Sequence, residues 1–168
     1  TDALLVEPDD REVIRCRVVA KSLDLKAGQL VDRVGGMLGL SFPAGPALEK
    51  LALKAGAVCH PRPSLQGLDC HLSGVENQCR HMADEDRPAE EVALFCLKSI
   101  EAALCGMTEG LLRTYGEMPL VYAGGFMSNT ILRRKLEKRY GGFFAPPAYS
   151  ADNAAGIAWL CGYQLGWR

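Results

Sequence analysis

The segment 119–129 constrains the fold more than any other part of the chain. Its residues 120–123 form a short apolar run, typical of a buried parallel strand. Gly124 and Gly125 follow, and then Ser128 and Asn129, which both favour the position just before a helix. A strand, a glycine turn and a helix N-terminus direct free backbone N–H groups at one point, where an anion can bind. The segment therefore predicts either a turn that contacts a phosphate or ribose, or an ordinary tight connection without a ligand.

The rest of the chain alternates predicted helices with short predicted strands. Apolar residues in 3–7 and 12–20, with a turn signal between them, predict a β-hairpin. Residues 143–145 predict another strand, and the segment 68–82 predicts a strand end that turns into a helix at Ser73. Helical spacing predicts further helices over 27–38, 47–55, 88–115, 131–140 and 151–165. This order predicts an α/β or α+β lobe whose helices cover a central sheet.

The longest predicted helix, 88–115, carries one continuous apolar stripe. The stripe consists of Val92, Cys96, Ile100, Leu104, Met107 and Leu111. Gly106 and Gly110 interrupt its last third, where we expect them to bend or loosen the helix.

Composition narrows the class of protein. The 168 residues suit one domain or one lobe of a larger protein, and the formal net charge of −1 indicates neither disorder nor a strongly basic surface. No apolar run reaches the roughly 18–20 residues that a membrane helix needs. The chain begins at Thr1 rather than at methionine, so we expect a piece of a longer protein. Seven cysteines without a C-x-x-C motif indicate a reducing cytoplasm rather than a disulfide framework.

Three segments together resemble one protein family. They are GQLVDR with GLSFPAGPAL (28–33 and 39–48), VYAGGFMSN with LR (121–129 and 132–133), and SADNAAGIA (150–158). Residues 68–74, LDCHLSG, fit a fourth and looser motif. The segments are similar to the C-terminal half of the TsaD/Gcp/YgjD family, once called O-sialoglycoprotein endopeptidases or glycoproteases. They are spread over almost the whole chain.

The resemblance implies the actin/hexokinase/Hsp70 (ASKHA) fold, in which two RNase H-like α/β lobes close on a nucleotide. Residues 1–168 would form the C-terminal nucleotide-binding lobe, with a helical insertion near 28–56, while the N-terminal lobe lies outside this chain. Family members transfer a threonylcarbamoyl group from its adenylate to the adenosine beside the tRNA anticodon. The whole protein would thus be a transferase, whereas this lobe alone would be inactive.

The resemblance also implies a role for each matching residue. Asp32 matches a ribose-binding aspartate, and a carboxylate accepts charge-assisted hydrogen bonds from sugar hydroxyls. Gly45 matches a backbone contact beside the nucleotide, where a side chain would collide. The Gly124-Gly125 turn and the Asn129 amide match the adenosine side of the site.

Asp152 matches the one carboxylate ligand of the family's active-site metal, iron or zinc, whose two histidine ligands belong to the N-terminal half. Asp152 also fits a plain helix cap. No residue of this chain is assigned a catalytic role. The cofactor would be ATP or the threonylcarbamoyl-adenylate. The expected partners are the protein's own N-terminal lobe, TsaB-like and TsaE-like proteins and tRNA, in the cytoplasm and away from membranes.

Several positions depart from the family pattern. Gln29 stands where the family has glutamate, Leu23-Asp24 where it has two acids, and Ala44 where it has a second glycine. The Gln29 change removes a charge beside the reaction centre. The alternative function is therefore a catalytically inactive scaffold or regulatory paralogue that keeps the fold. A small-molecule kinase of the same superfamily would explain the Gly124-Gly125 turn but not the other segments.

Two more features allow a functional and a structural interpretation. The first is a set of cysteines and histidines that could bind zinc, although their spacing matches no zinc finger, and core thiols with surface imidazoles are the alternative. These residues are Cys59, His60, Cys70, His71, Cys79 and His81. The second is a basic run that could contact tRNA phosphates or form a solvated helix face. Its members are Arg133, Arg134, Lys135, Lys138 and Arg139.

Overall fold

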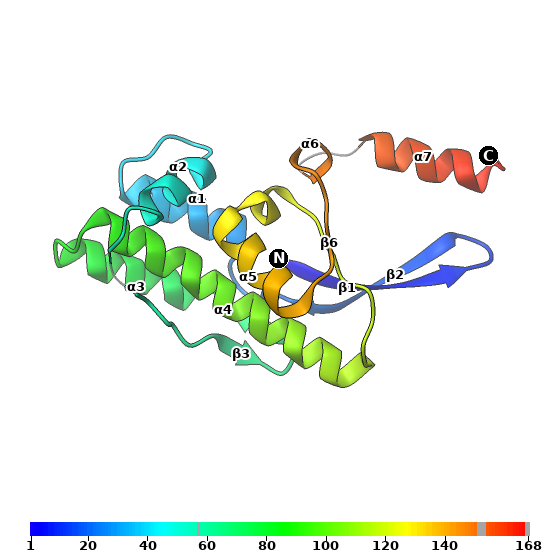
Figure 1. The fold of residues 1–168 in the computed structure, drawn as a ribbon, viewed down its shortest axis with the longest axis horizontal. Helices are drawn as coiled ribbons and strands as arrows, with labels where there is room; N and C mark the ends of the chain where they lie inside the picture. The colour runs from blue at the N-terminus through cyan, green and yellow to red at the C-terminus, as the bar shows by residue number, and fades with distance from the viewer. Residues whose placement is uncertain (57, 151–153, 167–168) are drawn as a thin grey trace.

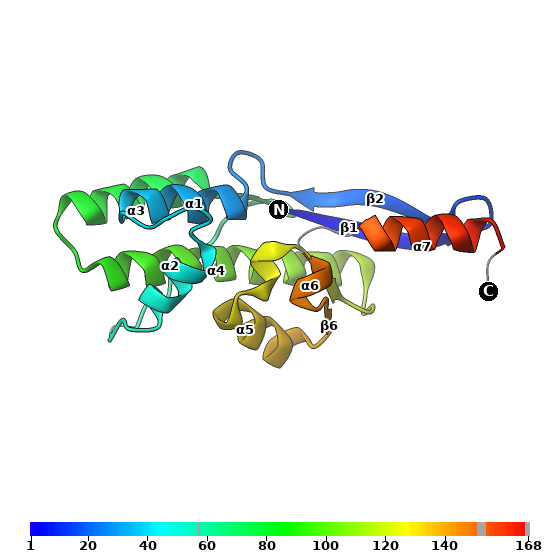
Figure 2. The same cartoon turned by 90° about the horizontal axis from the view of Figure 1, so that it is seen from above.

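The computed structural model describes residues 1–56, 58–150 and 154–166. In chain order its elements are β1 (Asp2–Asp9), β2 (Val13–Lys21), α1 (Ala27–Met37), α2 (Gly45–Ala52), β3 (Ser64–Gln66), β4 (Asp69–His71), α3 (Ser73–Asp84), α4 (Ala89–Tyr115), β5 (Val121–Tyr122), the 3-10 helix η1 (Gly125–Ser128), α5 (Thr130–Tyr140), β6 (Phe143–Phe144), α6 (Pro147–Ser150) and α7 (Ala154–Gln164). Figure 1 shows a helical body with the β1–β2 hairpin extending from one end. Viewed from above, α4 lies between a layer formed by α1 and α3 and the helix α5 (Figure 2).

The core of the molecule is built around α4. The predicted apolar stripe is confirmed, because Val92, Cys96 and Ile100 are fully buried and Met107 is nearly so. Helices α1, α2 and α3 all contact α4, and Leu30, Leu48 and Cys79 are their fully buried contributions to the same cluster. Full burial of each such leucine side chain stabilises the fold by about 1.5–3 kcal/mol before entropy is counted.

Gly106 and Gly110 make room for the β3–β4 hairpin. A Cβ atom at Gly106 would lie 2.6 Å from Cδ1 of Leu65, and one at Gly110 would lie 2.8 Å from Cδ2 of Leu68. Helix α4 continues through both glycines to Tyr115. Their structural role is therefore close approach of a neighbouring segment, rather than an interruption of the helix.

The N-terminal β-hairpin is confirmed. Its strands pair antiparallel, with Leu4 opposite Val18 and Pro8 opposite Ile14. Residues directly opposite in such a pair share one face. Leu4 is 54% exposed and Val18 is 55% exposed, so this apolar face of the hairpin lies open to solvent.

The predicted central sheet is not present as a single sheet in the described part of the chain. Three two-stranded sheets replace it: β1–β2 and β3–β4 are antiparallel, and β5–β6 is parallel. One isolated bridge, between Ser22 and Cys70, links the first two. The apolar run before the glycine turn does form a parallel strand, but Val121 is 72% exposed because β6 alone pairs with this strand. The expectation of a buried strand at this point is wrong.

The C-terminal segment returns to the hairpin. Helix α7 lies beside β2 in both views (Figures 1 and 2), and Nε2 of Gln164 donates a hydrogen bond to the Arg11 carbonyl at 3.4 Å. The predicted final helix is confirmed from Ala154 onward, and its first three predicted residues lie outside the described residues. No helix in the described ranges has the length and apolar character needed to cross a membrane.

Candidate functional site

Asp32 connects α1 to the start of α2. The spacing of Leu30, Val31 and Val34 turns one face of α1 into the core, which leaves Asp32 half-buried on its flank. Its Oδ1 accepts a hydrogen bond of 2.9 Å from the backbone N–H of Ala44, the residue before Gly45. Two predicted site residues, Asp32 and Gly45, are therefore neighbours in space.

The Gly124-Gly125 turn lies against the same helix. Gly124 has a φ of 105°, a region that L side chains rarely adopt, so this position requires glycine. One 3-10 turn, η1, separates the glycines from α5, and η1 contacts α1. The Gly124 carbonyl accepts hydrogen bonds from Met127 N and from the Ser150 hydroxyl, both at 2.9 Å.

Asn129 caps α5, as its residue type predicted. Its Oδ1 accepts hydrogen bonds from Ile131 N at 3.1 Å and Leu132 N at 3.2 Å, and the residue is only 7% exposed. Its amide nitrogen has no acceptor among the residues that the structure describes. The side chain thus fixes the helix start with its oxygen and leaves its N–H groups for another partner.

Glu49 links α2 to the N-terminus of α5. Its Oε1 accepts a hydrogen bond of 2.8 Å from Thr130 N and a second, short one from the Thr130 hydroxyl. A carboxylate at this point satisfies the positive end of the α5 dipole. The anion site expected at this helix N-terminus is therefore filled by a side chain of the chain itself, which sequence reasoning missed because the two residues lie far apart in the sequence.

These contacts bring Asp32, Gly45, Gly124, Gly125 and Asn129 into one region around α1, η1 and the ends of α2 and α5 (Figure 1). Asp152 lies outside the described residues. Ser150, the last described residue before this gap, donates a hydrogen bond to the Gly124 carbonyl. The described residues that were predicted to contact the nucleotide therefore lie near one another, while their roles in binding stay predictions.

Asp24 forms a second polar cluster, which the sequence did not indicate. Its carboxylate accepts hydrogen bonds from the backbone N–H groups of Leu25, Leu72 and Ser73 and from the Ser73 hydroxyl, the last at 2.6 Å. His71 Nδ1 lies 3.4 Å away. Partial burial raises the pKa of Asp24, but the hydrogen bonds from Leu72, Ser73 and Leu25 outweigh it and hold the pKa well below its usual range.

The Asp24 cluster borders a cavity of about 550 Å³, which Phe95 and Arg62 also line. The Asp24 carboxylate and both His71 ring nitrogens face partners within the chain, which leaves them little capacity for a ligand. None of the described residues predicted to contact the nucleotide lines this cavity. The predicted site is therefore separate from this cavity, and its residues range from buried Asn129 to exposed Gly125.

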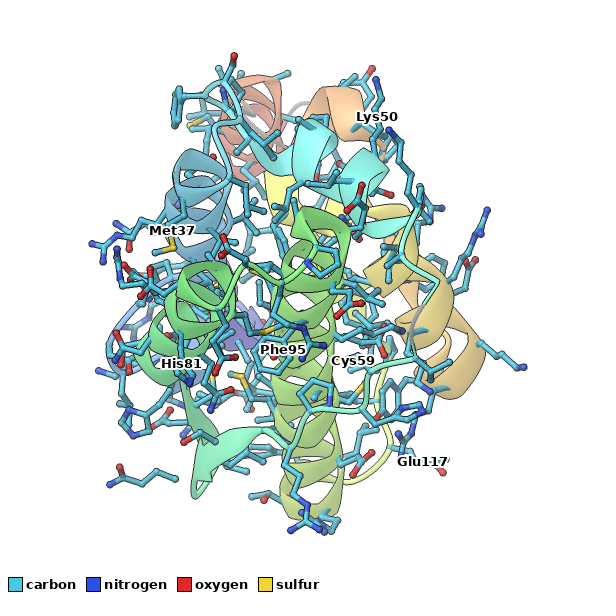
Figure 3. All side chains as sticks on the ribbon, turned by 90° about the vertical axis from the view of Figure 1, so that its left-hand side faces the viewer. Met37, Lys50, Cys59, His81, Phe95 and Glu117 are labelled. Atoms are coloured by element: carbon cyan, nitrogen blue, oxygen red, sulfur yellow. The ribbon has the colours of Figure 1, made fainter. Side chains whose placement is uncertain are left out.

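The cysteines and histidines do not form a zinc site in the described part of the chain. No group of three potential metal-binding side chains comes together there. Figure 3 shows Cys59 and His81 on opposite sides of α4. Cys79 is buried against Cys96, and a hydrogen bond between the two thiols, together with burial, raises the pKa of Cys96. Core thiols with exposed imidazoles at His60 and His81 fit the structure.

A comparison with protein-family models identifies the family of this chain. The family model described as "tRNA N6-adenosine threonylcarbamoyltransferase" (TsaD) matches residues 10–159. This range includes all the segments on which the resemblance was based, from 28–33 to 150–158. The match covers well over half of the chain, and it agrees with the mixed α/β structure. The chain is therefore a member of the TsaD family of tRNA N6-adenosine threonylcarbamoyltransferases.

Proposed function

We propose that this chain is the adenine-nucleotide-binding lobe of a tRNA threonylcarbamoyltransferase. The observation that carries the proposal is the convergence of Asp32, Gly45, the Gly124-Gly125 turn and Asn129 from three segments of the sequence. ATP or the threonylcarbamoyl-adenylate would bind at this surface. As an enzyme that modifies tRNA, the whole protein would act in the cytoplasm.

The contacts within the chain support specific roles. Asp32 uses one carboxylate oxygen for Ala44 and keeps the other for ribose hydroxyls. The N–H groups of Asn129 would hydrogen-bond to the adenosine. Because Glu49 occupies the start of α5, we assign this end of the site to the nucleoside rather than to its phosphates.

A second wall is needed to enclose the nucleotide, and the N-terminal lobe would supply it. The open apolar face of the hairpin supports this proposal, as do Trp159 and Ile157 of α7, which are each 65% exposed. Burial of such surface is the main favourable contribution to association of two lobes. TsaB-like and TsaE-like proteins and tRNA would be the external partners.

The family also implies a divalent metal. Asp152 would be the ligand from this chain, and imidazole and carboxylate ligands suit iron or zinc. The described residues offer no group of three ligands, so the remaining ligands would come from the other lobe. Bound there, the ion would supply Lewis-acid chemistry beside the nucleotide.

The alternative is a catalytically inactive scaffold, and Gln29 is the residue that favours it. Its Oε1 accepts a hydrogen bond of 3.3 Å from Lys26 N at the start of α1, a bond that glutamate could also make. The exchange of glutamate for glutamine thus keeps the helix start and removes a charge. Such a change is compatible with a protein that retains the fold and loses the chemistry.

The test uses the whole protein and the Asp32→Asn variant. Asparagine keeps an oxygen acceptor for Ala44 and loses the charge, so we expect an intact fold with ATP binding weakened on the order of tenfold or more. Asp84→Asn, an exposed aspartate at the end of α3, is the matched control and should bind ATP normally. Threonylcarbamoyl transfer to tRNA with the partner proteins then separates the alternatives. Binding without transfer would identify the scaffold, and no binding in a folded protein would refute the proposed site.

A further inference from the structure

Helix α5 carries a cationic face that ion pairs between described residues do not neutralise. Leu132 and Leu136 are fully buried against the core, whereas Arg134, Lys135 and Lys138 are exposed. Arg134 and Lys138 lie on the side of the helix opposite the two leucines, and Lys135 lies on the flank. Among the residues that the structure describes, none of these three cations has an ion pair or a side-chain hydrogen bond. Positions 134 and 138 are one helical turn apart, about 6 Å, and therefore form a contiguous row.

The other two basic residues of α5 already have partners. Arg133 lies 4.0 Å from Glu137 and stacks over the Phe144 ring, with its guanidinium carbon 5.1 Å from the ring centroid. Arg139 forms an ion pair of 2.6 Å with Glu109 of α4. The acids near this helix are thus engaged by Arg133 and Arg139, which leaves the positive charge of the other three in excess.

The cationic face continues into a small cavity. Lys135 and Arg139 line a space of about 140 Å³ together with Lys98 and His60. Lys98 is paired with Glu101 at 2.8 Å, so Lys135 contributes the unpaired charge at this rim. A helix face that only contacts solvent does not need its positive charges to continue into a cavity. Successive phosphates of a nucleic acid could contact these charges one after another, from the helix to the cavity.

We propose that the α5 face formed by Arg134, Lys135 and Lys138 binds the phosphate backbone of the RNA substrate. This inference rests on the proposed function, because α5 begins at Asn129, where the nucleoside site is assigned. The face extends about 13 Å from that point to Lys138. An RNA whose adenosine reached the threonylcarbamoyl group of a nucleotide bound here would bring its flanking phosphates near this face. Contacts of this kind hold an RNA in register and do not read its sequence.

The test compares two double variants of the whole protein with matched charge. Arg134→Gln/Lys138→Gln removes two cations from the face, and Arg11→Gln/Arg17→Gln removes two exposed cations from the hairpin. Glutamine has a helix propensity close to those of arginine and lysine, so α5 should remain folded. Fluorescence anisotropy with a labelled tRNA transcript measures affinity between about 50 and 200 mM salt, the range in which phosphate contacts respond strongly.

The α5 variant should bind tRNA on the order of tenfold more weakly and lower the slope of log K against log salt by about 2, with ATP affinity unchanged. The affinity of the α5 variant for an unrelated RNA of similar length should fall by as much. Equal tRNA binding by the α5 variant and wild type would overturn the proposal and assign the face to an acidic protein or to solvent. An equal loss in the hairpin control would also overturn it. Since RNA and ATP binding are measured separately, failure of the nucleotide site would be seen as lost ATP binding in the wild type.

Discussion

The Asp32 carboxylate and the Ala44 backbone N–H, twelve positions apart, form a hydrogen bond of 2.9 Å that fixes the entry into α2. Asp32→Ala should therefore lower the free energy of unfolding by about 1–2 kcal/mol, since hydrogen bonds to charged groups contribute about 1.5–3 kcal/mol and this one is partly exposed. Asp32→Asn keeps an oxygen acceptor and should cost less than half as much. Urea unfolding of both variants measures the difference, and equal losses would show that the bond has no structural role.

The glycines of α1 and α4 should respond differently to alanine. A Cβ at Gly36 meets nothing within 4 Å, so Gly36→Ala should stabilise the protein by about 0.5–1 kcal/mol. At Gly106 the new methyl group would lie 2.6 Å from Leu65, so this gain should be cancelled or reversed. Thermal unfolding gives the order of stability. A Gly106→Ala variant as stable as Gly36→Ala would contradict the packing role of Gly106.

Removal of the Leu65 side chain provides the control for this packing. In a Leu65→Ala background the methyl group at position 106 no longer meets Cδ1 of residue 65. Gly106→Ala should then recover most of its helix-propensity gain. A penalty that persisted in the double variant would place the strain in α4 itself.

Asp24 should make stability depend on acid pH. Its pKa is lowered in the folded chain, so its ionised form contributes stability above the unfolded-state pKa of about 3.9. That contribution should be lost as the pH falls below about 4 toward the lower folded-state pKa. Asp24→Asn should therefore be less stable than wild type at pH 7, and the gap should narrow on acidification. A gap that stayed constant from pH 7 to pH 3 would contradict the assignment.

Local sequence patterns predicted the elements that carry their own periodicity. The stripe from Val92 to Leu111 defined α4, and the two cap residues Ser128 and Asn129 indicated the start of α5, which Asn129 caps. The hairpin followed from its turn signal and from the alternation along β2. These features depend on residues that are close in the sequence, so a single sequence is enough to predict them.

Contacts between distant segments could not be predicted in the same way. Glu49 accepts a hydrogen bond from Thr130 at the start of α5, 81 positions away. Asp24 accepts one from Leu72 at the start of α3, 48 positions away. Neither bond has a signal in the local sequence. The role of Gly106 depends on Leu65, which only the fold brings close. The sheet was misjudged for a related reason. The pairing partners of a strand are set by tertiary contacts. In this chain most of the buried side chains lie between α4 and its neighbouring helices rather than on a sheet.

Gly125 offers the most direct test of the nucleotide site, because the chain itself has room for a side chain there. A Cβ at this glycine meets nothing within 4 Å, so Gly125→Ala should leave the melting temperature unchanged or slightly higher. The matched control is Gly74→Ala in α3, where a Cβ is equally unobstructed. Both variants are compared with wild type by calorimetric titration of ATP into the whole protein. The proposed site predicts ATP binding weakened on the order of tenfold by Gly125→Ala alone. Wild-type affinity in the Gly125→Ala variant would contradict it.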